Sequence, residues 1–591
     1  MNDPTPRSAP TFLPALSMPA LSLPALSLPA LSLTRRRTRR WTPGVDARAE
    51  LHRAPRPLVS RPGASGRQRH VVVVGGGIAG VTAAVALAER GVRVSLLEAQ
   101  PQLGGRVRSW PVEVDGRPDT MSRGFHAFFR QYYNLRSVLR RVDPDLSRLR
   151  PIEDYPLVHG DGSRDSFTKV PTRPPFNILG FVALSPSFGL ADLPRVDVER
   201  ALGLLDVDFP RTFVDLDGMS AQDVLDELAF PEGMRHLALE VFARSFFADP
   251  REFSAGELVG MFHTYFLGSA EGLLFDVSAD DFDTCWWAPL GQLLYRLGTR
   301  THTGVRVQRV ERVQPVHPEG EGESGRGGLA ARRGPLRVVT DSDHVNAAIE
   351  EVGPVDAVVL ATDRAALQHL VTASPDLGDE SWRAAIERGR IAPRFIVRRL
   401  WFDAPMRADA APFVGTAALG YLDNVSALHL FEEGAATWAR RTGGSVVELH
   451  AYAVPDDVDD ATVLTDLRAR LDDLHPELAG ATVVHEEVLV DADCPLIGTD
   501  PWAERPGVVT PEDDVVLAGD GIRCELPVAL MERAATTGFQ AANHLLTGWG
   551  LPGHDLWSVP TSARFPTTTR ALRAAARARP GGGRRRERDR V

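Results

Sequence analysis

The sequence feature that most constrains the fold is a glycine-rich turn directly after a run of four valines. Val71–Val74 predicts a short buried strand, and Gly75–Gly80 then satisfies the spacing G-x-G-x-x-G. Small helix-forming residues continue to Glu89, Gly91 ends that helix, and Val92–Leu97 predicts a second strand. Strand, turn, helix and strand in this register predict a βαβ dinucleotide-binding unit.

Each glycine of the turn has a physical task in such a unit. Gly75 permits the tight turn, Gly77 lets the backbone approach a pyrophosphate, and Gly80 lets helix and strand pack closely. The helix start at Ile78 and Ala79 presents free N–H groups and the positive end of the helix dipole to the phosphates.

Two segments after this unit bear on which dinucleotide is bound. Glu98, followed by Ala99, stands where an acid accepts hydrogen bonds from ribose hydroxyls, and its charge argues against a 2′-phosphate. Just beyond it, Gly104, Gly105 and Arg106 offer a second close backbone approach and a fixed positive charge.

A third segment lies more than 400 residues further along the chain. Val515–Ala518 predicts a strand that ends in Gly519 and Asp520, and a helix is predicted from Met531 to Leu546. The carboxylate can bind ribityl hydroxyls, and the helix start can face a flavin. Alone, the Gly-Asp pair reads as an ordinary turn, but paired with the N-terminal unit it favours FAD over NAD.

Together these three segments resemble the FAD-dependent amine oxidase and phytoene desaturase superfamily, over roughly residues 71–546. The resemblance implies one FAD site built from distant parts of the chain, with Val307 in the strand Val305–Val313 contacting the adenine. Val358–Thr362 is similar to the strand that returns the chain to the FAD-binding domain.

The predicted fold class is α/β, α+β overall. A Rossmann-like FAD-binding domain (70–115, 285–375 and 500–548) is interleaved with a mixed-sheet plus helical substrate domain (116–284 and 376–499). Within the second domain, β-rich segments are predicted at Arg394–Phe402, Leu419–Phe431, Ser445–Val454 and Thr482–Val490, with an amphipathic helix at Asp460–Leu474.

The two ends of the chain differ in charge from the rest. Residues 1–70 carry 12 Arg against three acids and residues 564–591 carry 10 Arg against two, so a net charge of −10 leaves about −27 for the middle. We expect disordered basic tails at 1–69 and 549–591, the first with a Pro-Ala-Leu-Ser repeat that prolines interrupt. Such tails can meet an anionic lipid surface or remain solvated, and nucleic acid is not expected as a partner.

The spacing of cysteine and histidine residues argues against metal sites and disulfide bonds. Cys285, Cys494 and Cys524 are far apart and form no CxxC pair, and no HExxH pair occurs, so no metal site and no disulfide framework are expected. A reducing cytoplasm fits this pattern. No Ser/His/Asp arrangement or pair of carboxylates at useful spacing supports hydrolysis.

The most distinctive segment on the substrate side is Gly124–Leu135, with five aromatic rings and a histidine in twelve residues. It reads either as a packed core helix or as an apolar wall beside the flavin that suits a polyene and stabilises a cation. The candidate catalytic residues are Phe125, His126, Tyr132 and Tyr133. We expect the rings, with Phe128, to shield a cation, and His126 or a nearby carboxylate to accept a proton.

The string Met121–Arg136 resembles carotenoid-modifying members of the superfamily, and most closely the isorenieratene synthase family. The resemblance implies desaturation of the β-ionone rings of β-carotene with a 1,2-methyl shift, which gives aromatic end groups. It implies peripheral contact with the cell membrane, because the substrate is insoluble in water. Quinone and oxygen both remain open as electron acceptor.

Three alternatives remain open from the sequence. The first is linear carotene desaturation or carotenoid isomerisation by a related flavoprotein. The second is a flavin oxidase of small amines, which the apolar segments disfavour. The third is a non-catalytic flavoprotein that holds a membrane or a partner through its basic tails.

Overall fold

A computed structural model describes residues 42–55, 68–177, 180, 198–228, 247–313 and 334–577. The parts of the predicted tails at residues 1–41, 56–67 and 578–591 lie outside the described residues. Among the described residues, no helix is long and apolar enough to cross a membrane.

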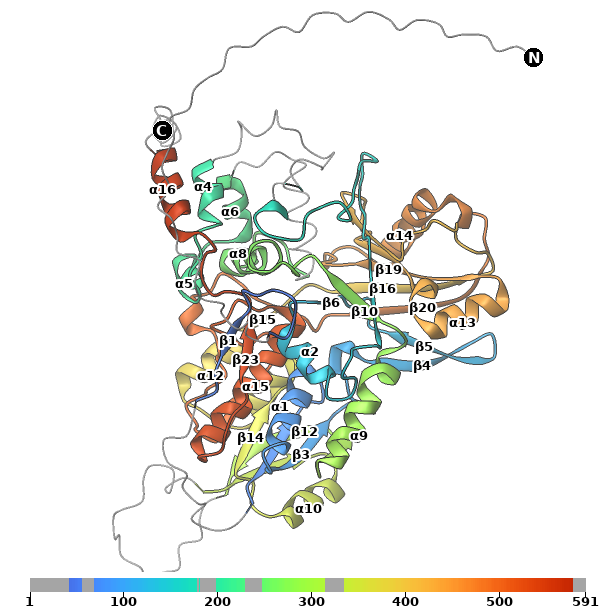
Figure 1. The fold of residues 1–591 in the computed structure, drawn as a ribbon. Helices are drawn as coiled ribbons and strands as arrows, with labels where there is room; N and C mark the ends of the chain where they lie inside the picture. The colour runs from blue at the N-terminus through green and yellow to red at the C-terminus, as the bar shows by residue number, and fades with distance from the viewer. Residues whose placement is uncertain are drawn as a thin grey trace, which may run out of the picture. The chain divides into compact units, whose positions relative to one another are not determined.

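A five-stranded parallel sheet carries the glycine-rich turn (Figure 1). Its strands are, in spatial order, β11 (Arg300–Thr303), β3 (Arg93–Glu98), β2 (His70–Val74), β14 (Ala357–Leu360) and β22 (Val515–Leu517). Side chains of β2 alternate between two separate apolar cores, with Val71 and Val73 in one and Val72 and Val74 in the other. The sheet is therefore covered on both faces, as a parallel sheet requires.

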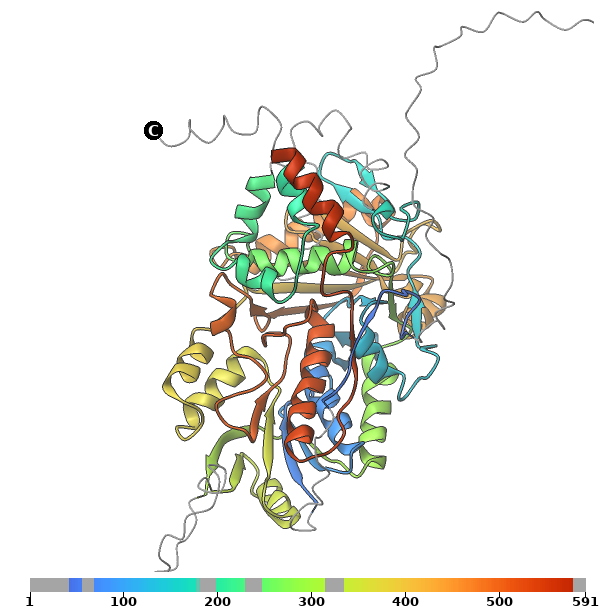
Figure 2. The ribbon, with the colours of Figure 1, turned by 60° about the vertical axis from the view of Figure 1, so that its left-hand side comes forward.

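Helices α1 (Ile78–Ala88), α9 (Ala288–Arg296) and α15 (Leu530–Gly548) cover one face of this sheet. Helices α1 and α15 lie side by side although 450 residues separate them (Figure 2). They approach closely because Gly538 has no side chain, since a Cβ there would lie 2.5 Å from the carbonyl oxygen of Ala79. The other face packs against β12 (Val307–Arg312), β13 (Leu336–Thr340), α10 (Asp343–Val352) and α11 (Arg364–Ala373), with α12 (Glu380–Glu387) beyond.

A second, seven-stranded mixed sheet forms the main part of the substrate side. Its order is β20 (Val483–Asp491), β16 (Phe395–Phe402), β19 (Ser445–Ala451), β18 (Asn424–Ala427), β17 (Phe413–Ala417), β8 (Leu157–His159) and β9 (Arg164–Asp165), and only β17 and β8 pair in parallel. Helix α14 (Asp460–Leu474) packs on one face and α13 (Glu433–Thr442) on the other.

Short elements connect the two sheets. The strands are β4 (Ser109–Val114), β5 (Arg117–Ser122), β6 (Phe128–Phe129), β7 (Leu149–Pro151), β10 (Phe275–Ser278), β15 (Arg390–Ile391) and β21 (Pro495–Leu496). The helices are α2 (Tyr133–Leu139), α4 (Val198–Gly203), α5 (Arg211–Asp215), α6 (Ala221–Leu228) and α8 (Ala255–Phe262), and α8 continues as a π-helical turn at His263–Leu267.

The predicted fold class is confirmed, and so is the helix Asp460–Leu474. The β-rich segments are confirmed except Leu419–Phe431, in which only Asn424–Ala427 is a strand and Leu428–Leu430 is a 3-10 turn. All five strands of the parallel sheet lie in the segments predicted for the FAD-binding domain, while the domain boundaries themselves stay a prediction.

The prediction of disordered tails was wrong for parts of 1–69 and 549–591. Strand β1 (Glu50–His52) pairs with β23 (Leu556–Ser558), and helix α16 (Pro566–Arg577) follows. The Arg573 guanidinium donates to Asp206 at 3.1 Å, so part of the C-terminal arginine excess pairs with the acidic body of the chain. Composition misled the prediction here because these short segments are ordered by partners far away in the sequence.

Candidate active site

A cavity of about 840 Å³ is lined by residues from both sheets. Most of the residues predicted to bind the cofactor line it: Gly75, Gly77, Ile78, Ala79, Glu98, Ala99, Gly104, Gly105, Arg106, Val307, Gly519, Asp520 and Met531. Three of the four candidate catalytic residues line it as well: Phe125, His126 and Tyr132. The cavity therefore brings together segments that span about 450 residues of sequence.

The glycine-rich turn forms a cradle of backbone in this cavity. A Cβ on Gly75, whose φ is +103°, would lie 2.4 Å from the carbonyl oxygen of Ala361, and one on Gly80 would lie 1.8 Å from that of Gly75. Gly80 does not line the cavity, so its contribution is the close packing predicted for it. Helix α1 starts at Gly77 with no side-chain cap and no acid in its first turn, which leaves its first N–H groups for an anion.

Glu98 closes one end of the cradle. Its two carboxylate oxygens accept hydrogen bonds from the backbone N–H groups of Gly76 at 2.6 Å and Gln100 at 2.7 Å. A carboxylate has about four lone-pair positions, so acceptor capacity is left for ribose hydroxyls. Val307, at the start of β12, also lines the cavity, and its contact with the adenine stays a prediction.

Arg106 and Asp520 form an ion pair across the cavity wall. Burial alone would raise the pKa of Asp520, but the charge of Arg106 outweighs burial and lowers that pKa. Their positions in the sequence predict separate tasks for these two residues, and the structure shows that each orients the other. Gly519 is fixed beside them, because its N–H donates to the Thr537 hydroxyl of α15 at 2.9 Å.

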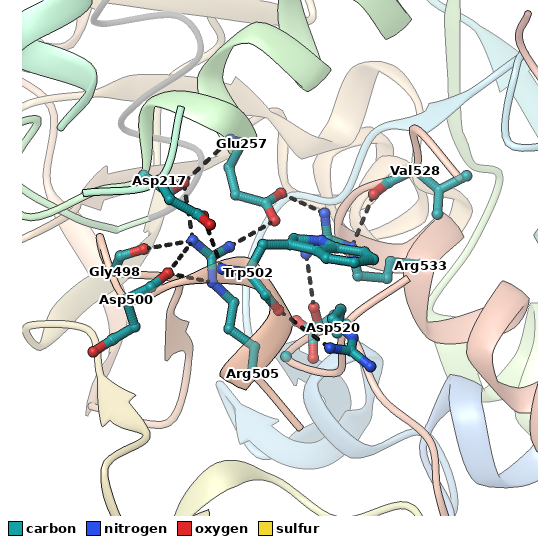
Figure 3. A network of polar contacts seen from close by, with 12 residues as sticks. Asp217, Glu257, Gly498, Asp500, Trp502, Arg505, Asp520, Val528 and Arg533 are labelled. Atoms are coloured by element: carbon teal, nitrogen blue, oxygen red, sulfur yellow. Dashed lines mark hydrogen bonds and ion pairs between the residues drawn. The ribbon is translucent and has the colours of Figure 1, made fainter. Parts of the chain in front are cut away.

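A second buried network supports the start of α15 (Figure 3). The Glu257 carboxylate of α8 accepts hydrogen bonds from Arg533 and, at 3.5 Å, from Arg505. Arg533 also donates to the carbonyl oxygens of Val528 at 2.9 Å and Asp520 at 3.5 Å. The network therefore ties the Gly519–Asp520 loop to the helical part of the substrate side, and Arg533 places a buried positive charge on the cavity wall.

Phe125 lies in an aromatic wall of the cavity. Its ring stacks on Phe413 with centroids 4.2 Å apart and meets the edge of Phe275 at 5.9 Å. Phe129, Tyr155 and Phe167 extend the same wall. Of the two readings of the aromatic segment, a core helix and an apolar wall, the wall describes Phe125 and Phe129.

His126 lies on the cavity wall beside Phe282, with its ring Nδ1 2.8 Å from the carbonyl oxygen of Gly124. That contact assigns the ring proton to Nδ1 and leaves Nε2 as an acceptor. Burial, together with the nearby charge of Arg123, lowers the pKa of His126 to about 4. His126 is therefore neutral at physiological pH and a weak base.

The other predicted aromatic residues divide between cavity and core. Tyr132 lines the cavity, and its hydroxyl bonds to that of Tyr265 at 2.6 Å. Tyr133, also predicted to shield the cation, is not among the residues that line the cavity, and its hydroxyl lies 3.4 Å from that of Ser269. Phe128 is also absent from the lining, since it packs against other rings in the core.

Polar residues of the second sheet also line the cavity, and the sequence analysis did not identify them. Among them are Asp423 directly before β18, Asn424 at its start and Tyr452 directly after β19; Thr416 and Asp491 line the cavity as well. A signal for Tyr452 exists, since Glu448, His450 and Tyr452 alternate in a buried strand and so share one face. Three polar groups on one face of a buried strand require partners, and such groups often mark a site.

The fold and the backbone cradle define a class of protein, the dinucleotide-binding flavoprotein oxidoreductases. A family model described as flavin containing amine oxidoreductase matches residues 78–546, and one for pyridine nucleotide-disulphide oxidoreductase matches residues 42–111. The chain belongs to the flavin containing amine oxidoreductase family. FAD is its cofactor, and it is an oxidoreductase, as the sequence predicts.

The chain is similar to several proteins of known name. The carotenoid phi-ring synthase of Streptomyces griseus is 52% identical, over 88% of this chain and 96% of its own length. The carotenoid phi-ring synthase of Chlorobaculum tepidum is 28% identical, over 84% of this chain and 91% of its own length. Putrescine oxidase has the same fold, with a TM-score of 0.56 and 15% identity over 81% of this chain and 99% of that one.

Proposed function

We propose that this protein desaturates the β-ionone rings of β-carotene and moves one methyl group from C1 to C2, which gives aromatic end groups. The observation that carries the proposal is the similarity over nearly the whole length to a carotenoid phi-ring synthase. The apolar, aromatic wall beside the FAD cradle supports it, because the β-ionone ring is apolar.

The residues of the cavity provide the positions that such chemistry requires. Backbone N–H groups at the start of α1, together with Glu98 and Arg106, would hold FAD, which supplies the hydride acceptor when bound. Phe125 and Phe413 line the cavity, and their ring faces can stabilise a positive charge on the substrate ring. The same wall excludes water, which would otherwise capture a cation.

The methyl shift requires no methyl donor, because the migrating group stays on the same ring. Each ring loses two pairs of hydrogens. In one of these two desaturations, hydride loss leaves a ring cation, the shift moves the charge, and proton loss forms a double bond; the other removes a second hydride and proton, and each hydride requires one oxidised flavin. His126 and Tyr132 are proposed to contact the reacting ring, since both line the cavity in the segment that carries Phe125.

The test is expression in a host that makes β-carotene, followed by chromatography and mass measurement of the pigments. The expected product has aryl end groups and four fewer hydrogens per ring. Linear desaturation or isomerisation gives products without aryl ends, and unchanged β-carotene with FAD bound would refute the assignment. The variant Gly75→Ala, which disrupts the cradle, is the matched control.

We further propose peripheral contact with a membrane, because a water-insoluble substrate must leave a bilayer to reach the cavity. The arginines of residues 1–41 and 578–591 favour anionic lipid in such a contact. The electron acceptor that reoxidises the flavin is proposed to be a quinone or oxygen, and oxygen consumption during turnover separates the two.

A further inference from the structure

Three polar residues of the second sheet form a hydrogen-bonded chain that ends at the cavity. The Tyr452 hydroxyl lies 2.7 Å from Nδ1 of His450, and Nε2 of His450 lies 2.9 Å from Oε1 of Glu448. These residues occupy alternate positions of β19 and its continuation, so they share one face of the strand. Of the three, Tyr452 lines the cavity, while His450 and Glu448 are buried behind it.

The direction of these hydrogen bonds follows from the charge of Glu448. Glu448 is ionised, because the guanidinium of Arg399 donates to its Oε2 at 2.7 and 2.9 Å. Burial opposes that state, but Arg399 outweighs burial and lowers the pKa of Glu448 to about 2. An ionised carboxylate only accepts, so Nε2 of His450 carries the proton and Nδ1 accepts from the Tyr452 hydroxyl.

A second group, the backbone N–H of Phe125, also lies near Nε2 of His450, but this contact is weaker than the one with Glu448. The backbone N–H of Phe125 points at Nε2 of His450, but the distance is 3.4 Å against 2.9 Å to Glu448. Charge-assisted bonds are the shorter and stronger ones, so Glu448 determines the tautomer.

The Tyr452 hydroxyl has room for one more proton donor. It donates to His450 and accepts from the side-chain amide of Asn424 at 3.1 Å. A hydroxyl has two lone pairs, so one is without a partner among the described residues. Since Tyr452 lines the cavity, that lone pair is available to a substrate there.

We propose that Tyr452 is a catalytic residue that takes the proton lost by the substrate ring, that His450 receives the Tyr452 hydroxyl proton, and that Glu448 is a positioning residue that holds His450. This inference rests on the proposed function. A ring C–H next to the cation gives its proton to the Tyr452 oxygen, while the Tyr452 hydroxyl proton moves to Nδ1 of His450. The electron pair of the broken C–H bond becomes a ring double bond, and the Glu448 carboxylate balances the imidazolium.

The hydrogen bonds that His126 and Tyr132 make lead to neutral groups. Nδ1 of His126 is bound to a backbone carbonyl, and Arg123 nearby opposes a second positive charge on the ring. The Tyr132 hydroxyl bonds to that of Tyr265, another phenol, which is a weak proton acceptor. The Tyr452 chain, in contrast, ends in an ionised carboxylate.

The second sheet provides a matched control for the relay. His485 and Glu487 on β20 form a pair with the same spacing and the same 2.9 Å distance, but neither lines the cavity. Replacing His485 therefore removes a histidine–glutamate pair from the same sheet without touching the proposed proton path.

The experiment compares Tyr452→Phe, His450→Gln and the control His485→Gln as purified FAD-bound proteins with β-carotene, in H₂O and D₂O. We expect Tyr452→Phe and His450→Gln to form aryl product at least about 100-fold more slowly, with FAD content unchanged. The wild type and His485→Gln should show a solvent isotope effect on single-turnover product formation, which Tyr452→Phe loses.

Several outcomes would overturn the relay. If Tyr452→Phe forms aryl product at the wild-type rate, the relay is refuted and the proposed function stands. If the wild type forms no aryl product, both are refuted. Should Tyr452→Phe fail to fold, His450→Gln decides, since a wild-type rate of aryl product formation in that variant excludes His450 as the acceptor of the hydroxyl proton. Equal slowing in His485→Gln would show a general effect on the sheet.

Discussion

The buried network at the start of α15 gives a prediction with a definite magnitude. The side chains of Glu257 and Arg533 are each 5% exposed and that of Arg505 is 12% exposed, so water cannot replace a lost partner. Removing one member of a buried ion pair costs about 3–5 kcal/mol of folding free energy. We expect Glu257→Gln to lose about 3 kcal/mol, since the amide oxygen still accepts one hydrogen bond.

The matched control is Glu252→Gln. Glu252 pairs with Arg390, but these side chains are 42% and 51% exposed, and exposed pairs contribute at most about 1 kcal/mol. Urea unfolding followed by circular dichroism gives the free energy, and flavin fluorescence reports release of FAD. We expect Glu257→Gln to release FAD at lower urea as well, because Arg533 supports the Gly519–Asp520 loop. A loss below about 1 kcal/mol, equal to that of the control, would refute the argument from burial.

Three further predictions concern the cradle, pH and lipid. Gly75→Ala should purify without FAD, whereas Gly91→Ala, which also has a positive φ but open space around its Cβ, should keep it, as flavin absorbance will show. The pKa of Glu448 is lowered from 4.5 to about 2, so its ionised form contributes folding free energy that is fully present above pH 4.5 and is lost as pH falls through 2. The difference in unfolding free energy between wild type and Glu448→Gln should therefore decrease over that range in urea titrations. A constant difference would contradict the assignment. Deleting 1–41 and 578–591 should weaken flotation with anionic vesicles without loss of bound FAD, and undiminished flotation would count against a role for these arginines.

The nucleotide-binding half could be predicted from the sequence because its signal is local. The strand Val71–Val74, the glycine turn and the helix from Ile78 follow one another directly, and only glycine fits where a Cβ would meet the backbone. The helix Asp460–Leu474 was predicted to the residue, since Asp459 caps it and apolar residues recur at helical spacing.

Long-range pairing explains what the sequence did not reveal. The strand at Glu50–His52 exists because Leu556–Ser558 pairs with it. Three residues are too few to show an alternation of apolar and polar side chains, so the sequence did not predict this pairing. Likewise Tyr133 and Tyr132 are neighbours of the same type, yet one faces Ser269 and the other the cavity. Which side a residue of this segment faces depends on tertiary packing that the sequence pattern does not contain.

The measurement that tests the central claim most directly uses β-carotene labelled with ¹³C in the methyl groups on C1 of each ring. The purified FAD-bound protein should convert it to a product with aryl end groups in which one labelled methyl per ring has moved to C2, as carbon NMR will show. All labelled carbon should remain in the product without any methyl donor present. A product without aryl rings, or one that has lost a labelled methyl, would contradict the account.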